Sequence, residues 1–135
     1  MNTARYLGHW ILIPELSLYQ SGEPPLSGEY LIGSDGELIE FEVIWKDAAG
    51  LDHNLRFGGP LDGKKHPTET PGVSHICYEQ ISDSILDSTA YDEDEVGFYA
   101  RRAVSEDGGL LVVSQVLHGE HGKSSNFQVY RRKNA

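Results

Sequence analysis

Toward its end the chain reads VGFYARRAV (96–104), SEDGG (105–109), LLVVSQVLH (110–118), GEHGK (119–123) and SSNFQVYRR (124–132). Three short runs rich in valine, leucine and aromatic residues alternate here with two glycine-containing stretches. Asp-Gly and Gly-Gly supply the positive φ values that tight hairpins require. The stretch therefore predicts three antiparallel strands joined by two hairpins.

The same alternation covers the rest of the chain, and no segment carries a long helical pattern. Further reversals are expected at Asp35-Gly36, 47–50, 58–60 and Asp62-Gly63. Short strands separated by regular turns are typical of an antiparallel sandwich or barrel. The predicted strands cover residues 7–13, 27–33, 38–46, 51–57, 65–68, 73–80, 84–91, 96–104, 110–118 and 124–132.

These strands predict an all-β protein with one domain over residues 1–135, built as a single antiparallel up-and-down barrel of about eight to ten strands. Closure into a barrel removes exposed strand edges, and barrels of roughly this size hold one small ligand. Residues 15–25, which contain Pro24 and Pro25, are expected to cross irregularly between the first two strands.

Charge and cysteine content limit the possible partners. The net charge is −10, and such a surface repels nucleic-acid phosphates and anionic lipid headgroups. Cys77 is the single cysteine, so no intramolecular disulfide forms, which fits a reducing compartment. The apolar run at residues 7–13 is too short for a signal peptide or a membrane span. We expect a cytoplasmic protein with no membrane span and no nucleic-acid partner.

A set of short motifs occurs in a consistent order. They are GHW (8–10), SGEPP (21–25), DAAG (47–50), LDGKKHP (61–67), ARRAVSEDG (100–108) and VYRR (129–132). Together they resemble a group of bacterial lipocalin-like (calycin-like) barrel proteins, mostly of unassigned activity. The resemblance implies a lipocalin-like or fatty-acid-binding-protein-like barrel. It also implies that Trp10 plugs one barrel end, with Arg131 or Arg132 across the indole in a cation–π contact.

Arg101 and Arg102 lie next to each other on a predicted strand. Side chains alternate along a strand, so one arginine points into the barrel and the other points out. An inward arginine needs an anion or a hydrogen-bonded partner, because an unpaired buried charge is costly. It either anchors a ligand carboxylate, which arginine binds in bidentate fashion, or forms an internal salt bridge with Glu42 or Glu79.

Other candidates come from the last strand and from the aromatic residues. Tyr130 and Arg132 share one face, and fatty-acid-binding proteins hold a carboxylate with an arginine and a tyrosine near the C-terminus; a structural role of Arg132 over Trp10 competes with this. Lumen-facing tyrosines would orient a ligand in an apolar cavity. The predicted ligand-binding residues are His75, Tyr78, Tyr99, Arg101, Arg102, Tyr130 and Arg132.

The six histidines show no zinc-ligand spacing, so no metal or other cofactor is predicted. His75 and Cys77 share one strand face and would bind metal or form a thiolate pair, although a half-buried histidine beside an inert thiol is the commoner arrangement. The acidic run at 92–95 is expected to form a solvated hairpin turn.

Three functions follow. The favoured hypothesis is a barrel that binds a small apolar or amphipathic ligand, such as a fatty-acid-like carboxylate, without chemistry. The alternative is a filled barrel that serves as an interaction domain and forms a homodimer. The third is an isomerase or cyclase acting on a bound lipid, with His75, Tyr99 and Arg102 as its acid–base set.

Overall fold

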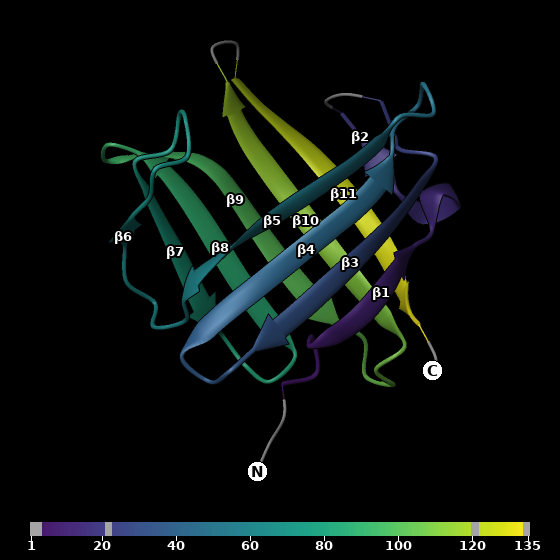
Figure 1. Ribbon diagram of the computed structural model, residues 1–135, viewed down its shortest axis with the longest axis horizontal. Coiled ribbons are helices and arrows are strands. Elements are labelled where there is room, and N and C mark those ends of the chain that lie inside the picture. The colour runs from purple at the N-terminus through teal and green to yellow at the C-terminus, as the bar shows by residue number, and fades with distance from the viewer. Residues whose placement is uncertain (1–3, 21–22, 120–121, 134–135) are drawn as a thin grey trace.

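Eleven strands form one antiparallel sheet in the computed structural model, which describes residues 4–20, 23–119 and 122–133. The sheet curls into a nearly closed barrel (Figure 1). The strands are β1 (Gly8–Leu12), β2 (Leu18–Tyr19), β3 (Ser27–Ser34), β4 (Leu38–Lys46), β5 (Asp52–Pro60), β6 (His66–Pro67), β7 (His75–Gln80), β8 (Ile85–Asp92), β9 (Glu95–Val104), β10 (Leu110–Gly119) and β11 (Gly122–Arg132). The predicted all-β antiparallel barrel is confirmed, with one strand more than the ten expected, because β2 lies in the predicted crossover.

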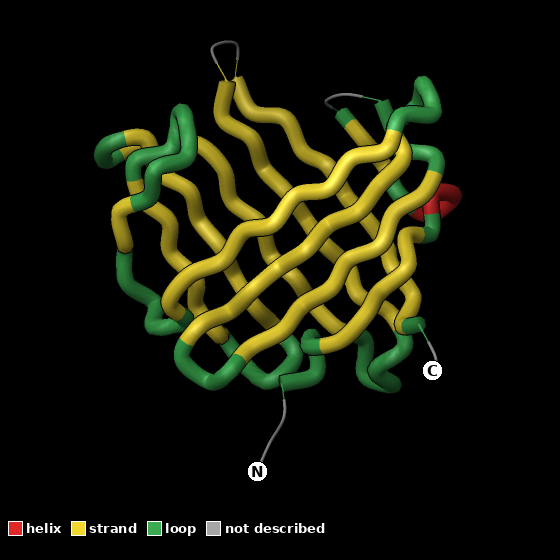
Figure 2. The backbone as a smooth tube through the Cα atoms, viewed as in Figure 1, coloured by secondary structure: helices red, strands yellow, loops and turns green. Residues whose placement is uncertain are grey.

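The strand order is β5-β4-β3-β1-β11-β10-β9-β8-β7-β6, with β2 paired to β11. β1 joins the two halves of the chain, because Trp10 lies opposite Tyr30 on β3 and opposite Arg132 on β11. Within the described residues no ladder connects β5 to β6 or β7, so the ring of strands stays open there. Loops gather at the two ends of the barrel (Figure 2).

One predicted reversal is wrong. Residues 58–60 do not reverse the chain but continue β5, where Pro60 pairs with Leu38. An edge strand tolerates proline and glycine because one side of it needs no ladder hydrogen bonds. A Cβ at Gly58 would lie 2.2 Å from the carbonyl oxygen of Ile39, so glycine lets β5 approach β4 closely.

The predicted irregular crossover contains short regular elements. A 3₁₀ turn, η1 (Pro14–Leu16), begins at Pro14, and the two residues of β2 then pair with Asn126 and Phe127. No α-helix occurs in the described part of the chain, so the barrel mouth has no helical cover there. Ser21 and Gly22 of this crossover, and Glu120 and His121 of the last predicted turn, lie outside the described residues.

One end of the barrel is packed solid. Trp10 is 0% exposed, and its Nε1 donates a hydrogen bond to the Tyr6 carbonyl at 3.0 Å. The guanidinium carbon of Arg132 lies 4.1 Å from the centroid of the Trp10 ring, so the expected cation–π contact uses Arg132 rather than Arg131. The Arg132 guanidinium also donates to the backbone carbonyls of Arg5, Leu7 and Gly108.

Aspartates stabilise the hairpin turns. The Asp35 carboxylate accepts hydrogen bonds from the backbone N–H groups of Leu38 and Glu37, at 2.8 and 2.9 Å. These bonds hold the pKa of Asp35 below its ordinary value. The pKa of Asp107 is lowered in the same way by the Ser105 hydroxyl and the Gly109 N–H.

The lowered pKa of Asp35 predicts a pH-dependent contribution to stability. Because the folded-state value is depressed, the contribution is complete above the unfolded pKa of about 3.9 and is lost as pH falls through the folded value. Asp35→Ala should therefore lower the free energy of unfolding at neutral pH, and the difference from the parent should shrink in strong acid. Urea unfolding followed by tryptophan fluorescence measures both; a difference that is equal at the two pH values contradicts the prediction.

Candidate ligand-binding cavity

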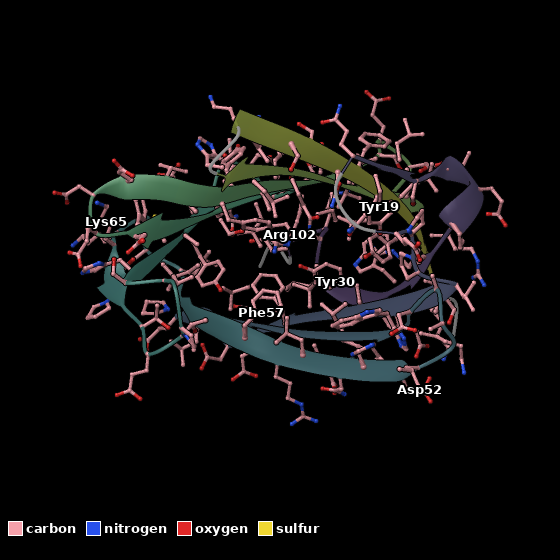
Figure 3. All side chains as sticks on the ribbon, turned by 90° about the horizontal axis from the view of Figure 1, so that it is seen from above. Tyr19, Tyr30, Asp52, Phe57, Lys65 and Arg102 are labelled. Carbon is pink, nitrogen blue, oxygen red and sulfur yellow. The ribbon has the colours of Figure 1, made fainter. Side chains whose placement is uncertain are left out.

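The alternation of side chains along β9 places Arg102 inside the barrel and Arg101 outside. Arg102 is 3% exposed and lies opposite Leu86 on β8 and Val113 on β10, both fully buried. Seen from above, Arg102, Tyr30 and Phe57 project into the space between the two walls (Figure 3). Arg102 therefore lies just above the packed end, at the floor of the remaining space.

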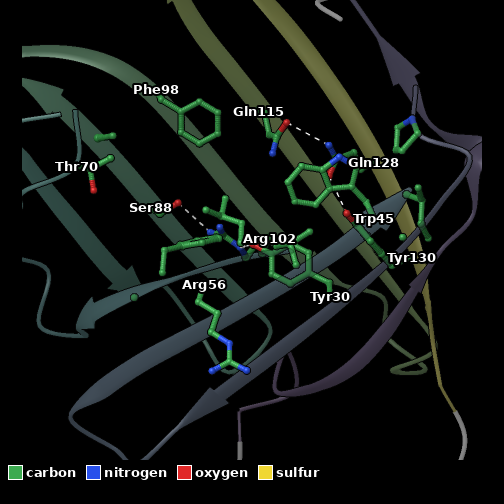
Figure 4. A pocket seen from close by; sticks show the side chains of 18 of the residues that line it. Tyr30, Trp45, Arg56, Thr70, Ser88, Phe98, Arg102, Gln115, Gln128 and Tyr130 are labelled. Carbon is green, nitrogen blue, oxygen red and sulfur yellow. Dashed lines mark hydrogen bonds between the residues drawn. The ribbon is translucent and has the colours of Figure 1, made fainter. Parts of the chain in front are cut away.

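The partners of Arg102 are hydroxyl groups. Its Nε donates to the Tyr30 hydroxyl at 2.7 Å, and its Nη1 donates to Ser88 Oγ at 2.9 Å (Figure 4). The guanidinium carbon also lies 4.4 Å from the centroid of the Phe41 ring. Burial raises the pKa of Tyr30 despite the nearby Arg102 charge, so this hydroxyl stays neutral and does not neutralise the arginine.

Within the described residues Arg102 forms no salt bridge, although its charge contributes to lowering the pKa of Asp87, which binds Arg101 on the outer face. The predicted internal salt bridge is wrong, because Glu42 faces outward and pairs with Arg56 and Asn54, while Glu79 is exposed. Arg102 Nη2 makes no hydrogen bond to any described residue. No fully buried polar side-chain atom of the described chain lacks a partner. Because Nη2 has no partner, it is not fully buried, and its accessible surface faces the cavity.

A cavity of about 660 Å³ extends from Arg102 toward the mouth of the barrel. Its volume is in the range that holds a drug-sized small molecule, about 300–1,000 Å³. The wall from β4 and β5 is mainly apolar, although Asp47 and Arg56 also border the cavity, and the other wall includes polar residues of β10 and β11. The cavity lining includes Val43, Trp45, Leu55, Phe57, Ile76, Tyr78, Ser88, Phe98, Gln115, Gln128 and Tyr130. An open lumen is at odds with the filled-barrel hypothesis.

Two of the predicted tyrosines line this cavity. Tyr78 is 2% exposed, and burial raises its pKa to about 12. Its hydroxyl forms no side-chain hydrogen bond with the described residues. Tyr130 is 4% exposed, its pKa is also raised by burial, and its hydroxyl donates to Gln128 Oε1 at 2.9 Å. Both remain neutral hydrogen-bonding groups near physiological pH.

The other predicted residues do not line the cavity. Arg101 and Tyr99 both bind the Asp87 carboxylate on the outer face, with all three bonds at 2.8 Å. His75 does not face the lumen, and its Nδ1 contacts Ser74 Oγ at 2.9 Å. Arg132 is held at the closed end. The predicted acid–base set of His75, Tyr99 and Arg102 is thus split between two faces of the sheet.

The pairing of His75 with Cys77 offers no reactive centre. Both lie on the face of β7 opposite the lumen-facing Ile76 and Tyr78. Burial, and then the Glu79 charge, raise the pKa of the Cys77 thiol, so the thiolate is disfavoured. The described residues contain no group of three side chains placed to bind a metal ion.

Several polar cavity residues were not predicted, among them Tyr30 as a partner of Arg102, together with Ser88, Gln115 and Gln128. Ser88 becomes visible only through strand register, because Leu86 pairs with Arg102 and the next inward position on β8 is Ser88. Gln115 follows from Val113 in the same way on β10. A register fixed from Arg102 would have located both.

The chain matches no protein-family model and no curated protein sequence. Solved structures are similar over nearly all of it. The fluorescent protein UnaG in its wild-type form aligns with a TM-score of 0.66 and 16% identity, covering 96% of this chain and 98% of that one. Zebrafish ileal bile acid-binding protein complexed with cholic acid aligns with a TM-score of 0.56 and 14% identity, covering 96% and 99%.

At these identities the similarity shows the fold, which is a fatty-acid-binding-protein-like calycin barrel. The narrower resemblance to a bacterial lipocalin-like group stays a prediction. In the described part of the chain no helix is long and apolar enough to cross a membrane.

Proposed function

We propose that this protein binds a small amphipathic molecule with a carboxylate, of the fatty-acid type, inside the barrel and holds it without chemical conversion. The observation that carries the proposal is Arg102, a buried cation at the floor of an apolar-lined cavity with no carboxylate partner among the described residues. A buried charge is costly unless it is paired. A ligand carboxylate supplies the missing partner.

The groups around Arg102 fit a carboxylate. Nη2 faces the cavity and donates to one carboxylate oxygen in a charge-assisted hydrogen bond. The Tyr78 hydroxyl, which is free of described partners, is available to the second oxygen. Tyr78 lies near Arg102, because the Arg102 charge acts to lower the pKa of Tyr78 and both side chains contact the Phe41 ring. The apolar part of the ligand then lies along Val43, Leu55 and Phe57 toward the mouth.

One comparison supports this reading. A solved barrel of the same fold is complexed with cholic acid, which carries a carboxylate. A cytoplasmic location is part of the proposal and is supported by the single cysteine.

The adjacent arginines provide a matched test. Titration with dansylaminoundecanoate, followed by competition with dodecanoate, measures affinity for a carboxylate. Arg102→Gln should weaken binding by about 10- to 100-fold, the value of one hydrogen bond to a charged group. Arg101→Gln removes the same charge from the outer face and should change affinity by less than about twofold.

Dodecanol, which lacks the carboxylate, separates the head group from the chain. The parent protein should bind dodecanol more weakly than dodecanoate. The affinity for dodecanol should be the same in the parent and in Arg102→Gln. Equal loss of dodecanoate affinity in the two arginine variants, or no uptake of either probe by the parent protein, contradicts the proposal.

A further inference from the structure

We infer that the ligand carries a second polar group, a hydroxyl or a carbonyl, on one side of its apolar part, where Gln115 donates a hydrogen bond to it. This inference rests on the proposed function and specifies its ligand. It starts from the polar wall of the cavity, formed by Gln115, Gln128 and Tyr130, which binding of a carboxylate alone does not use.

The hydrogen bonds of the polar wall run in one direction. The Tyr130 hydroxyl donates to Gln128 Oε1 at 2.9 Å, and Gln128 Nε2 donates to Gln115 Oε1 at 3.3 Å (Figure 4). This series of hydrogen bonds ends at Gln115 Nε2, which has no partner among the described residues. This amide nitrogen therefore offers its N–H groups to an acceptor in the cavity.

Strand register gives the position of that acceptor relative to the carboxylate. Arg102 on β9 lies opposite Val113 on β10, and Gln115 is the next inward residue toward the mouth. Such diagonal neighbours on one face of a sheet are separated by roughly 7–8 Å. The second polar group thus belongs in the half of the ligand nearest the carboxylate, not at its far end.

The apolar residues of the opposite wall favour a ligand whose second polar group lies on one side only. Val43, Leu55 and Phe57 come from β4 and β5 and present only hydrocarbon to the cavity. An unsubstituted alkyl chain satisfies that wall but covers the Gln115 amide and removes water from it. A buried donor left without an acceptor costs more than an ordinary hydrogen bond contributes, so the cavity discriminates against such a chain.

A series of octadecanoates with a hydroxyl at different positions tests this inference. The parent protein should bind 7-hydroxyoctadecanoate about five- to tenfold more tightly than octadecanoate, as one buried hydrogen bond predicts. A hydroxyl at carbon 17 should give no such gain. Gln115→Leu should remove the preference for the 7-hydroxyl, so that 7-hydroxyoctadecanoate and octadecanoate bind this variant with affinities within about twofold of each other.

Control variants separate recognition from folding. Ser114→Ala changes the neighbouring residue on the outer face and should keep the preference. Gln115→Met, which keeps the side-chain length and also lacks the amide, should behave like Gln115→Leu.

The outcomes distinguish the two proposals. Equal affinities for the hydroxylated and plain acids, or a preference that persists in both Gln115 variants, overturns this inference, because the polar wall then binds only water. Octadecanoate binding that depends on Arg102 leaves the proposed function standing in that case. If the parent binds no acid of the series, the proposed function is overturned, and this inference with it.

Discussion

Replacing Arg102 by methionine should make the ligand-free protein more stable, by about 1–3 kcal/mol in the free energy of unfolding. Desolvating an arginine costs several kcal/mol, and hydrogen bonds to the neutral hydroxyls of Tyr30 and Ser88 return only part of it. Methionine is flexible and apolar, and packs against the Phe41 and Tyr30 rings. Tyr30 and Ser88 border the cavity, so water can replace the lost donor.

Urea unfolding of the parent and of Arg102→Met, each with and without a saturating carboxylate ligand, checks this prediction. The order of stabilities should reverse with ligand, because only the parent gains free energy from binding. Arg101→Met is the control and should be slightly less stable than the parent with and without ligand, because it loses its exposed ion pair to Asp87. A ligand-free Arg102→Met that is less stable than the parent would give Arg102 a structural role and remove the main support for a carboxylate site.

Trp10→Ala should cause the largest loss of stability in the chain, about 3–5 kcal/mol. The indole is fully buried in the packed end, bonds to the Tyr6 carbonyl and lies beneath the Arg132 guanidinium. Its removal leaves a cavity and also takes away the surface that holds Arg132, whose other contacts tie three backbone segments together. The barrel has no disulfide to compensate.

Trp45 supplies the comparison for Trp10. It is half-buried in the wall of the ligand cavity and stacks on His53 with ring centroids 5.0 Å apart. Trp45→Ala should therefore cost much less stability than Trp10→Ala while weakening ligand binding. Denaturant unfolding measures the first effect and probe titration the second. If Trp10→Ala does not fold, Trp10→Phe should still show a smaller loss; similar losses for the alanine variants would contradict the assignment of one packed end and one open end.

The strands could be predicted because their signal is local. Glycine and aspartate at the reversals, and β-branched and aromatic residues between them, determine where the chain turns without reference to its neighbours. The same locality explains the error at residues 58–60. Two glycines and a proline are typical of a turn, but at a sheet edge they are equally compatible with a strand, and only the pairing with residues 38–40 decides between them.

The residues of the candidate site could not all be predicted, because their positions depend on how the strands pair, which no single strand determines. Alternation showed that Arg101 and Arg102 face opposite ways, but not which one faces in. Tyr99 was predicted correctly as a strand residue, yet the same alternation places it outside with Arg101. Ser88 and Gln115 carry no chemical signal of their own. They become part of a site only because register sets each of them diagonally beside Arg102 on the inner face.

The order of strands in the sheet also says how this chain must fold. Every ladder along the sheet joins strands that follow one another closely in sequence, except for the β1–β11 ladder and the short β2 addition. That ladder pairs Trp10, near the start of the chain, with Arg132, near its end. Closing so long a loop is entropically expensive and slows folding. The two ends of the described chain already touch, since the Lys133 N–H bonds to the His9 carbonyl. A circular permutant joined there and opened between β5 and β6 would follow the sheet from one edge to the other, with its long-range pairing made local.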